Sequence, residues 1–207
     1  MKYFIFVLFC LILFCNCATY QYKSGKVKSF LPPRDQAKSF KKQFNLHDFD
    51  INNFEREIEQ NTHFPYAEYF SPQSLNAFRT KYPKTLILFW NPGCGASKRM
   101  FLFAQKLDSI NIPVVLVSIN YLLPNIIANI QNSRFKNRVI YILTPNHERT
   151  NIVISKIRTF AKEACSVCYE EYKDQLRTTE AIMVTKDSIE LFFRINEEEI
   201  EDKIITK

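Results

Sequence analysis

The sequence predicts an α/β domain in which helices flank a central, mixed β-sheet. Short, almost wholly apolar runs rich in β-branched and aromatic residues alternate with longer amphipathic stretches. Strand, helix and strand in this alternation are typical of right-handed crossovers and a parallel sheet. The last two apolar runs are separated only by Lys186, Asp187 and Ser188, which predicts an antiparallel hairpin. A parallel sheet with such a hairpin is a mixed sheet.

Composition excludes several classes of protein. The chain has 207 residues, of which 46% are hydrophobic and 24% charged, which is typical of one folded domain with additional segments. Only 3 Gly against 19 Phe and 10 Tyr excludes glycine-rich low complexity and predicts a sizeable aromatic core. The net charge of +7 is modest for this length and does not indicate a nucleic-acid partner. No glycine-rich phosphate loop or Ser/His/Asp order stands out.

Residues 1–17 predict an export signal. Lys2 is followed by an unbroken apolar and aromatic run to Phe14, which is too short to span a bilayer comfortably. Cys17 follows this run and would carry the lipid anchor of a bacterial lipoprotein; cleavage after Ala18 and an uncleaved anchor are the alternatives. All three place the remaining chain on the periplasmic side of a bacterial envelope. Residues 18–34, with scattered lysines and a proline pair, are expected to be a tether.

The folded part is expected in two segments, an N-terminal helical extension over 35–69 and a main domain over 70–207. Scattered aromatic residues in the first segment favour one or two short amphipathic helices. Ser71 and Pro72 predict the start of a packing helix. Thereafter the sequence predicts strands at 85–90, 112–119, 139–143, 181–185 and 189–195, and helices at 95–108, 123–134, 149–172 and 196–203.

Cys94 is the candidate nucleophile. It stands at the start of a predicted helix, just after the buried strand that ends at Trp90. A helix N-terminus offers unpaired N–H groups and partial positive charge, which favour a thiolate over a thiol. The alternative is an inert, buried cysteine. Without the leader, Cys94, Cys165 and Cys168 remain, and an odd number in an exported chain indicates one pair and one free thiol.

The segment around Cys94 carries a family resemblance. Phe89-Trp90-Asn91-Pro92-Gly93-Cys94-Gly95-Ala96-Ser97-Lys98 resembles the active-site segment of thioredoxin-like proteins, and the order of elements is similar over roughly 70–203. The extra helix and strand before the hairpin are similar to the insertion in membrane-anchored thioredoxin and redoxin domains of bacterial envelopes. The resemblance implies a catalytic site at Cys94 and Ser97. It also implies a substrate groove that includes Trp90, Pro92, Gly93, Thr178 and Thr179.

Three positions depart from that family, and a fourth departs from the pattern of redoxin-fold peroxidases. Ser97 replaces the second cysteine, so the motif cannot form a local disulfide and only a monothiol site remains. Leu88 stands where many thioredoxins have a buried carboxylate. Thr179 stands where the family has a cis-proline, and because a non-proline cis bond is costly, the loop is expected to be trans or reshaped. Asn91 replaces the threonine with which redoxin-fold peroxidases bind peroxide. Altered or absent activity is therefore favoured.

A second motif, Cys165-Ser166-Val167-Cys168, lies on or near the long predicted helix. It would form a structural or redox disulfide, supply a resolving thiol for Cys94, remain as reduced core residues, or bind metal. A lone Cys-x-x-Cys is weak evidence for zinc, and no metal or cofactor is expected.

Two functions follow from these motifs. The first is a membrane-anchored thiol–disulfide oxidoreductase acting on protein disulfides. The alternative is a non-catalytic thioredoxin-fold scaffold lipoprotein that binds a protein partner. Neither would bind nucleic acid.

Overall fold

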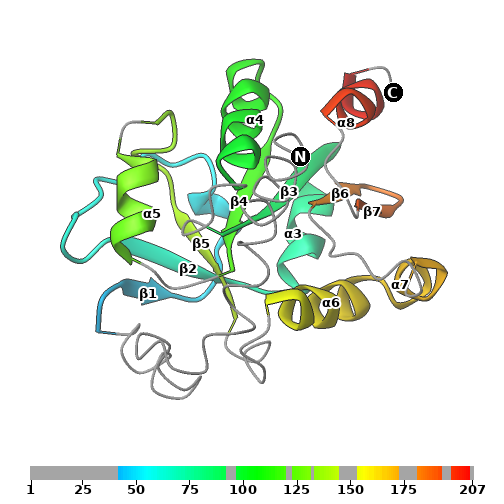
Figure 1. Cartoon of the computed structure of the whole chain (residues 1–207), viewed down its shortest axis with the longest axis horizontal. Coiled ribbons are helices and arrows are strands. Elements are labelled where there is room, and N and C mark those ends of the chain that lie inside the picture. Colours follow the sequence, from blue (N-terminus) through cyan, green and yellow to red (C-terminus); the bar gives the residue numbers. More distant parts are fainter. Residues whose placement is uncertain are drawn as a thin grey trace, which may run out of the picture.

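The computed structural model shows an α/β fold built on a mixed, seven-stranded sheet with helices on both faces (Figure 1). The predicted α/β class, with a mixed sheet flanked by helices, is confirmed. The strand order is β1-β2-β5-β4-β3-β6-β7. The structure describes residues 42–91, 97–119, 123–131, 133–144, 153–172, 181–192 and 197–205.

The strands from β1 to β3 in this order are all parallel, whereas β6 runs antiparallel to β3 and β7 antiparallel to β6. The predicted antiparallel hairpin is thus confirmed. The strands are β1 (Asn45–His47), β2 (Tyr66–Phe70), β3 (Lys84–Trp90), β4 (Val114–Ser118), β5 (Ile140–Leu143), β6 (Ala181–Thr185) and β7 (Ile189–Phe192). The helices are α3 (Ser74–Lys81), α4 (Ser97–Ser109), α5 (Leu123–Ile130), α6 (Val153–Ala164), α7 (Ser166–Tyr172) and α8 (Glu197–Ile205), with a 3₁₀ turn η1 (Ile51–Asn53).

Strand β3 is buried on both faces, which explains its continuous apolar sequence. Leu86, Leu88 and Trp90 contribute to one core layer. Ile87 and Phe89 contribute to the other layer. Because successive side chains of a strand point to opposite faces, a strand between two helical layers needs apolar residues at every position.

Different helices supply the two core layers. Helices α4, α5 and α8 contribute buried side chains to the layer that contains Leu88, among them Phe103, Leu107, Ile126 and Ile200. Helices α3 and α6 contribute to the layer that contains Phe89, with Leu75, Phe78, Ile157 and Phe160. Phe160 packs edge-on to Phe89, with ring centroids 5.2 Å apart, and stacks on Phe70. These contacts hold α6 against the middle of the sheet.

The predicted helical extension over 35–69 is wrong for the part that the structure describes. Residues 42–69 contain β1, η1 and most of β2, and both strands join the main sheet. The residues of β1 and β2 acquire their conformation by pairing with neighbouring strands, and a local apolar pattern carries little information about such pairing. The segment therefore extends the sheet and does not form a helical layer of its own.

Helix boundaries also differ from prediction, and the helix expected over 123–134 ends at Ile130. The long helix expected over 149–172 is divided at Cys165 into α6 and α7. The helix expected at Ser71 begins three residues later, at Ser74, whose hydroxyl accepts a hydrogen bond from the Ser71 N–H. Ser71 therefore does not cap α3.

Candidate functional site

The structure describes only some of the residues that the sequence singled out. The structure describes Trp90, Ser97, Cys165 and Cys168. Cys17, Pro92, Gly93, Cys94, Thr178 and Thr179 lie outside the described residues. The site predicted around Cys94 is therefore defined here by the elements on either side of it.

The end of β3 is anchored deeply in the core. Trp90 is only 2% exposed, and its ring lies 5.2 Å from that of Phe101 on α4. Phe101 in turn contacts Phe135 edge-on at 5.8 Å. The carbonyl of Trp90 accepts a hydrogen bond of 3.0 Å from the Ile119 N–H. In this structure Trp90 therefore supports the strand and α4, and it offers almost no surface to a substrate.

Helix α4 begins at Ser97, three residues after Cys94 in the sequence. Phe103, Ala104 and Leu107 are buried and fix the helix against the sheet. Lys98 is exposed on its first turn. In the sequence, the Cys94 motif thus connects the buried central strand to a helix whose apolar side chains pack over the sheet.

Strand β3, which precedes the segment that contains Cys94, ends on the same side of the sheet as its parallel neighbour. The carboxyl ends of β3 and β4 lie side by side, because Trp90 pairs with Ser118. Strand β6 is antiparallel and begins near these carboxyl ends, with Ala181 opposite Leu88. In open α/β sheets, ligands bind outside the carboxyl ends of the parallel strands.

Cys165 and Cys168 form a disulfide, with sulfurs 2.02 Å apart and Cα atoms 5.3 Å apart. Cys165 lies between α6 and α7, and Cys168 lies in the first turn of α7. The Cys168 N–H donates to the sulfur of Cys165 at 3.2 Å. The Cys168 sulfur lies 3.2 Å from the carbonyl oxygen of Ile189, at the start of β7.

This disulfide and the end of β3 lie toward opposite ends of the strands. Ile189 pairs with Val184, which pairs with Thr85 at the beginning of β3. Trp90 is five positions further along the strand (90 − 85), or about 17 Å at about 3.4 Å per residue. The pair therefore lies far along the strand direction from Trp90, whereas Cys94 itself lies outside the described residues.

A buried carboxylate on β2 is a polar feature that sequence reasoning missed. Glu68 is fully buried and accepts hydrogen bonds from the Asp50 N–H at 3.0 Å, the Asn53 side-chain amide at 2.7 Å and the Tyr66 hydroxyl at 3.1 Å. Burial, followed by the nearby charge of Glu68, raises the pKa of Tyr66 to about 12. His47 stacks on Tyr66 at 4.5 Å. The network ties η1 to the sheet, because all three donors point at one carboxylate.

The only sequence signal for this network is the glutamate within the apolar run Tyr66-Ala67-Glu68-Tyr69-Phe70. A charged residue in a buried strand requires partners, but the sequence does not say where they come from.

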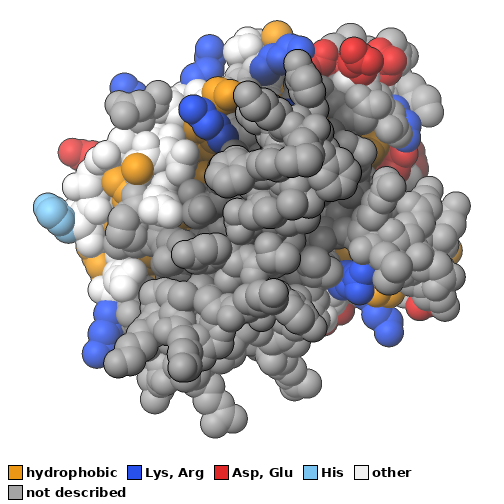
Figure 2. Space-filling model, viewed as in Figure 1, with side chains coloured by type: hydrophobic (Ala, Val, Ile, Leu, Met, Phe, Trp, Pro, Cys, Tyr) orange, Lys and Arg blue, Asp and Glu red, His pale blue; other side chains and the backbone are white. Residues whose placement is uncertain are grey.

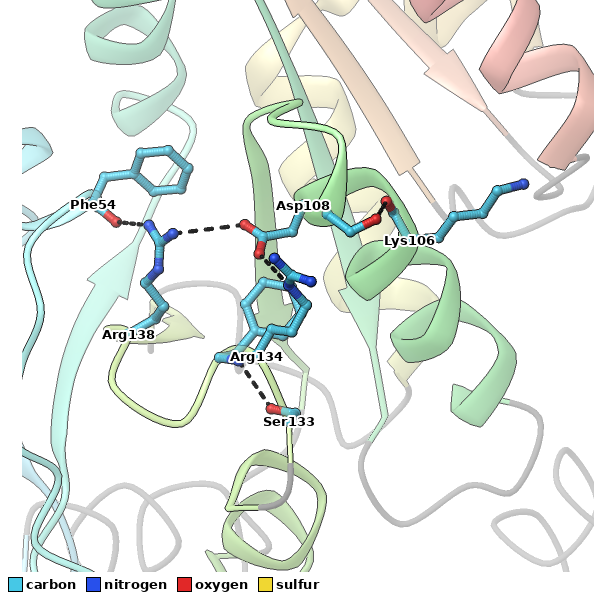
Figure 3. Close-up of polar contacts among 8 residues, drawn as sticks. Phe54, Lys106, Asp108, Ser133, Arg134 and Arg138 are labelled. Atoms are coloured by element: carbon cyan, nitrogen blue, oxygen red, sulfur yellow. Dashed lines mark hydrogen bonds and ion pairs between the residues drawn. The ribbon is translucent and has the colours of Figure 1, made fainter.

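A second polar cluster lies at the end of α4 (Figure 3). The Asp108 carboxylate forms two ion pairs: its Oδ2 lies 3.5 Å from Nε of Arg134, and its Oδ1 lies 3.7 Å from Nη2 of Arg138. Arg138 also donates to the carbonyl oxygen of Phe54 at 3.2 Å. The adjoining cavity, about 30 Å³, is lined in part by Trp90 and Phe135. It has room for about one water molecule, so it does not suit a substrate.

Charged side chains of opposite sign meet where α8 lies beside α4. Acidic side chains gather at α8 (Figure 2), and Glu201 pairs with Lys106 of α4 at 2.5 Å. Among the described residues, no three His, Cys, Asp or Glu side chains are grouped so that they could hold a metal ion. In the same ranges, none of the helices combines the length and the apolar character needed to cross a membrane.

A scan against protein-family models finds no match to this chain, and a search among curated proteins finds no significant match either. The site is therefore interpreted from residue chemistry and geometry.

Proposed function

We propose that this chain is an exported, thioredoxin-like thiol–disulfide oxidoreductase of the bacterial envelope, anchored to the membrane by a lipid on Cys17. Cys94 is its nucleophile, and protein disulfides are its substrates. The observation that carries the proposal is the position of Cys94 in the chain, between the central strand β3 and the packed helix α4. Strand β6, antiparallel to β3, enters the sheet near the end of β3, with Ala181 opposite Leu88.

The order of elements supports a thioredoxin-like core. Parallel β3 and β4 are followed, after further helices and strand β5, by the antiparallel β6–β7 hairpin and by α8. Strand β5 is inserted into the sheet between β2 and β4. This strand and α5 are the additional helix and strand that the resemblance to envelope redoxin domains implies.

The proposed reaction needs one protein sulfur and two external thiols. The Cys94 thiolate attacks a sulfur of the substrate disulfide, so that a mixed disulfide forms and one substrate thiolate leaves and takes up a proton. Since Ser97 has no sulfur, an external thiolate attacks the Cys94 sulfur of the mixed disulfide, and the second substrate thiolate leaves and takes up a proton. A second external thiolate then attacks the outer sulfur of the new mixed disulfide and releases Cys94. The substrate disulfide becomes two thiols, and the two external thiols become a disulfide.

The test uses full-length protein in which Cys165 and Cys168 are replaced by alanine, so that Cys94 is the remaining cysteine of the folded part. A disulfide-containing peptide should form a mixed disulfide with this protein, detected by mass spectrometry, and Cys94→Ser should abolish the product. Ser97→Cys should release the reduced peptide without an added thiol, because it provides a local resolving sulfur. Capture of the peptide by the Cys94→Ser protein would show that Cys94 is not the nucleophile.

A non-catalytic, thioredoxin-like scaffold is the second candidate. It is favoured by Leu88, which is fully buried and occupies the position of the family's proton-accepting carboxylate. Leu88 cannot accept a proton, so it cannot assist a thiol reaction as that carboxylate does. A scaffold predicts that Cys94→Ser leaves binding to a protein partner unchanged, whereas an oxidoreductase predicts loss of the covalent complex.

A further inference from the structure

We propose that the Cys165–Cys168 disulfide is a second redox site, which exchanges electrons with protein dithiols and disulfides through the sulfur of Cys165. This inference does not rest on Cys94, because the pair contacts the start of β7, toward the opposite end of the strands from the end of β3. Three features of the α6–α7 junction carry it: an unequal environment of the two sulfurs, an exposed flank, and a very short covalent loop.

The two sulfurs have opposite polar neighbours. Cys165 accepts a hydrogen bond from the Cys168 N–H at 3.2 Å, and such a bond favours a thiolate. The Cys168 sulfur faces the Ile189 carbonyl oxygen at 3.2 Å, which can accept a bond from a thiol but repels a thiolate. When the disulfide is reduced, these contacts therefore favour a thiolate at Cys165 over one at Cys168.

The two residues enclosed by the disulfide are exposed. Ser166 is exposed, and Val167 is 80% exposed, although it is apolar. Cys168 and Tyr169 pack against the core on the other side of α7. A partner that approaches the exposed flank meets an apolar side chain beside Cys165, as a protein substrate would require.

The covalent loop is too short for the disulfide to be mainly a stabilising cross-link. The two cysteines are three residues apart in the sequence. The entropy that a cross-link removes from the unfolded chain falls as the loop shortens, so this pair is near the lower end of what a disulfide contributes. A redox role explains the pair better than a structural one.

The reaction balances within the pair and its partner. A thiolate of a partner dithiol attacks the Cys165 sulfur, the bond to Cys168 breaks, and Cys168 leaves with the electron pair and takes a proton. The second partner thiol then attacks the mixed disulfide and releases Cys165 as a thiolate. The partner loses two electrons and becomes a disulfide, and the pair becomes a dithiol. The reverse sequence reduces a partner disulfide.

The experiment uses the full chain with Cys94→Ser, so that its result is independent of the proposed Cys94 chemistry. Folded protein is equilibrated with buffers of reduced and oxidised glutathione, and the pair is followed by alkylation and mass spectrometry. We expect reversible opening at millimolar reduced glutathione, with the fold retained in circular dichroism. A pair that opens only after unfolding would overturn the proposal, because that behaviour is typical of structural disulfides.

Matched variants identify the attacking sulfur. In the same background, Cys168→Ser should capture a disulfide peptide on the order of tenfold faster than Cys165→Ser, because only the former keeps the favoured thiolate. Limited alkylation of the reduced, unsubstituted pair is the second measurement, and it should label Cys165 first. Equal labelling of the two sulfurs, or faster reaction at Cys168, would contradict the assignment.

Discussion

The two cysteine-bearing regions of this chain are supported in different ways. The strand that leads to Cys94 is buried between two helical layers, and its last residue, Trp90, is enclosed by α4. The disulfide lies at a junction of two helices, where Val167 is exposed and Cys168 contacts the start of β7. The strand before Cys94 is thus supported by the whole core, whereas the disulfide is held by contacts at the surface of the fold.

The largest effect is expected when the support of β3 is removed. Trp90→Ala deletes a ring that is almost wholly buried against Phe101, so we expect a loss of about 3–5 kcal/mol in the free energy of unfolding. Urea denaturation measures this loss. Leu102→Ala, on the exposed side of α4, is the control and should change stability by about 0.5 kcal/mol or less. Equal losses in the two variants would refute the proposed support.

A smaller effect is expected from removing the disulfide. Replacing both Cys165 and Cys168 by alanine should cost about 2 kcal/mol or less, since the chain-entropy model gives about that value for so short a loop. The measurement is urea denaturation of the double variant beside the unsubstituted protein. A loss as large as that of Trp90→Ala would make the pair a structural cross-link and would remove the contrast between the two regions.

An intermediate effect is expected at high pH from Tyr66 on β2. In the strand order, β2 is separated from β3 by β5 and β4, so this effect is independent of both cysteine regions. The pKa of Tyr66 is raised from 10.0 to about 12 in the folded protein. A raised folded pKa contributes stability that is complete below pH 10 and is lost as pH rises from 10 to 12. Tyr66→Phe should weaken this pH dependence, measured by denaturation at pH 9, 11 and 12. An unchanged slope would show that Tyr66 does not contribute to it.

The smallest effect is expected at the exposed flank of the disulfide. Val167→Ser should alter the free energy of unfolding by about 0.5 kcal/mol or less, because the side chain is mostly in solvent. If the flank is a contact surface, the same change should slow the exchange of the disulfide with a peptide dithiol. Glutathione, which is too small to cover the flank, should react at an unchanged rate. A destabilised variant would show instead that Val167 packs against the fold.

Much of the fold could be predicted from local patterns. The central strand β3 was evident because six consecutive buried positions, 85–90, carry apolar residues or threonine. The hairpin was evident from its short connection. The early strands were not, because β1 has only three residues and β2 contains Glu68, whose burial depends on donors from Asp50 and Asn53.

The cysteine motifs could also be predicted from local sequence, whereas their contacts in the fold could not. The sequence singled out Cys165 and Cys168 but left their pairing open, because proximity at three residues' separation depends on local backbone geometry. The break at Cys165 and the contact with Ile189 are properties of the folded chain. No local pattern relates the α6–α7 junction to a strand that follows it by about twenty residues.

The sequence alone determined the fold class, the central strand, the hairpin and the cysteine motifs, since apolar periodicity and residue chemistry are local properties. The tertiary structure decided that residues 42–69 join the sheet, that Glu68 has buried partners, and that the disulfide lies far along the strand direction from Trp90. These depend on which strands become neighbours, and strand order results from packing between segments distant in the chain.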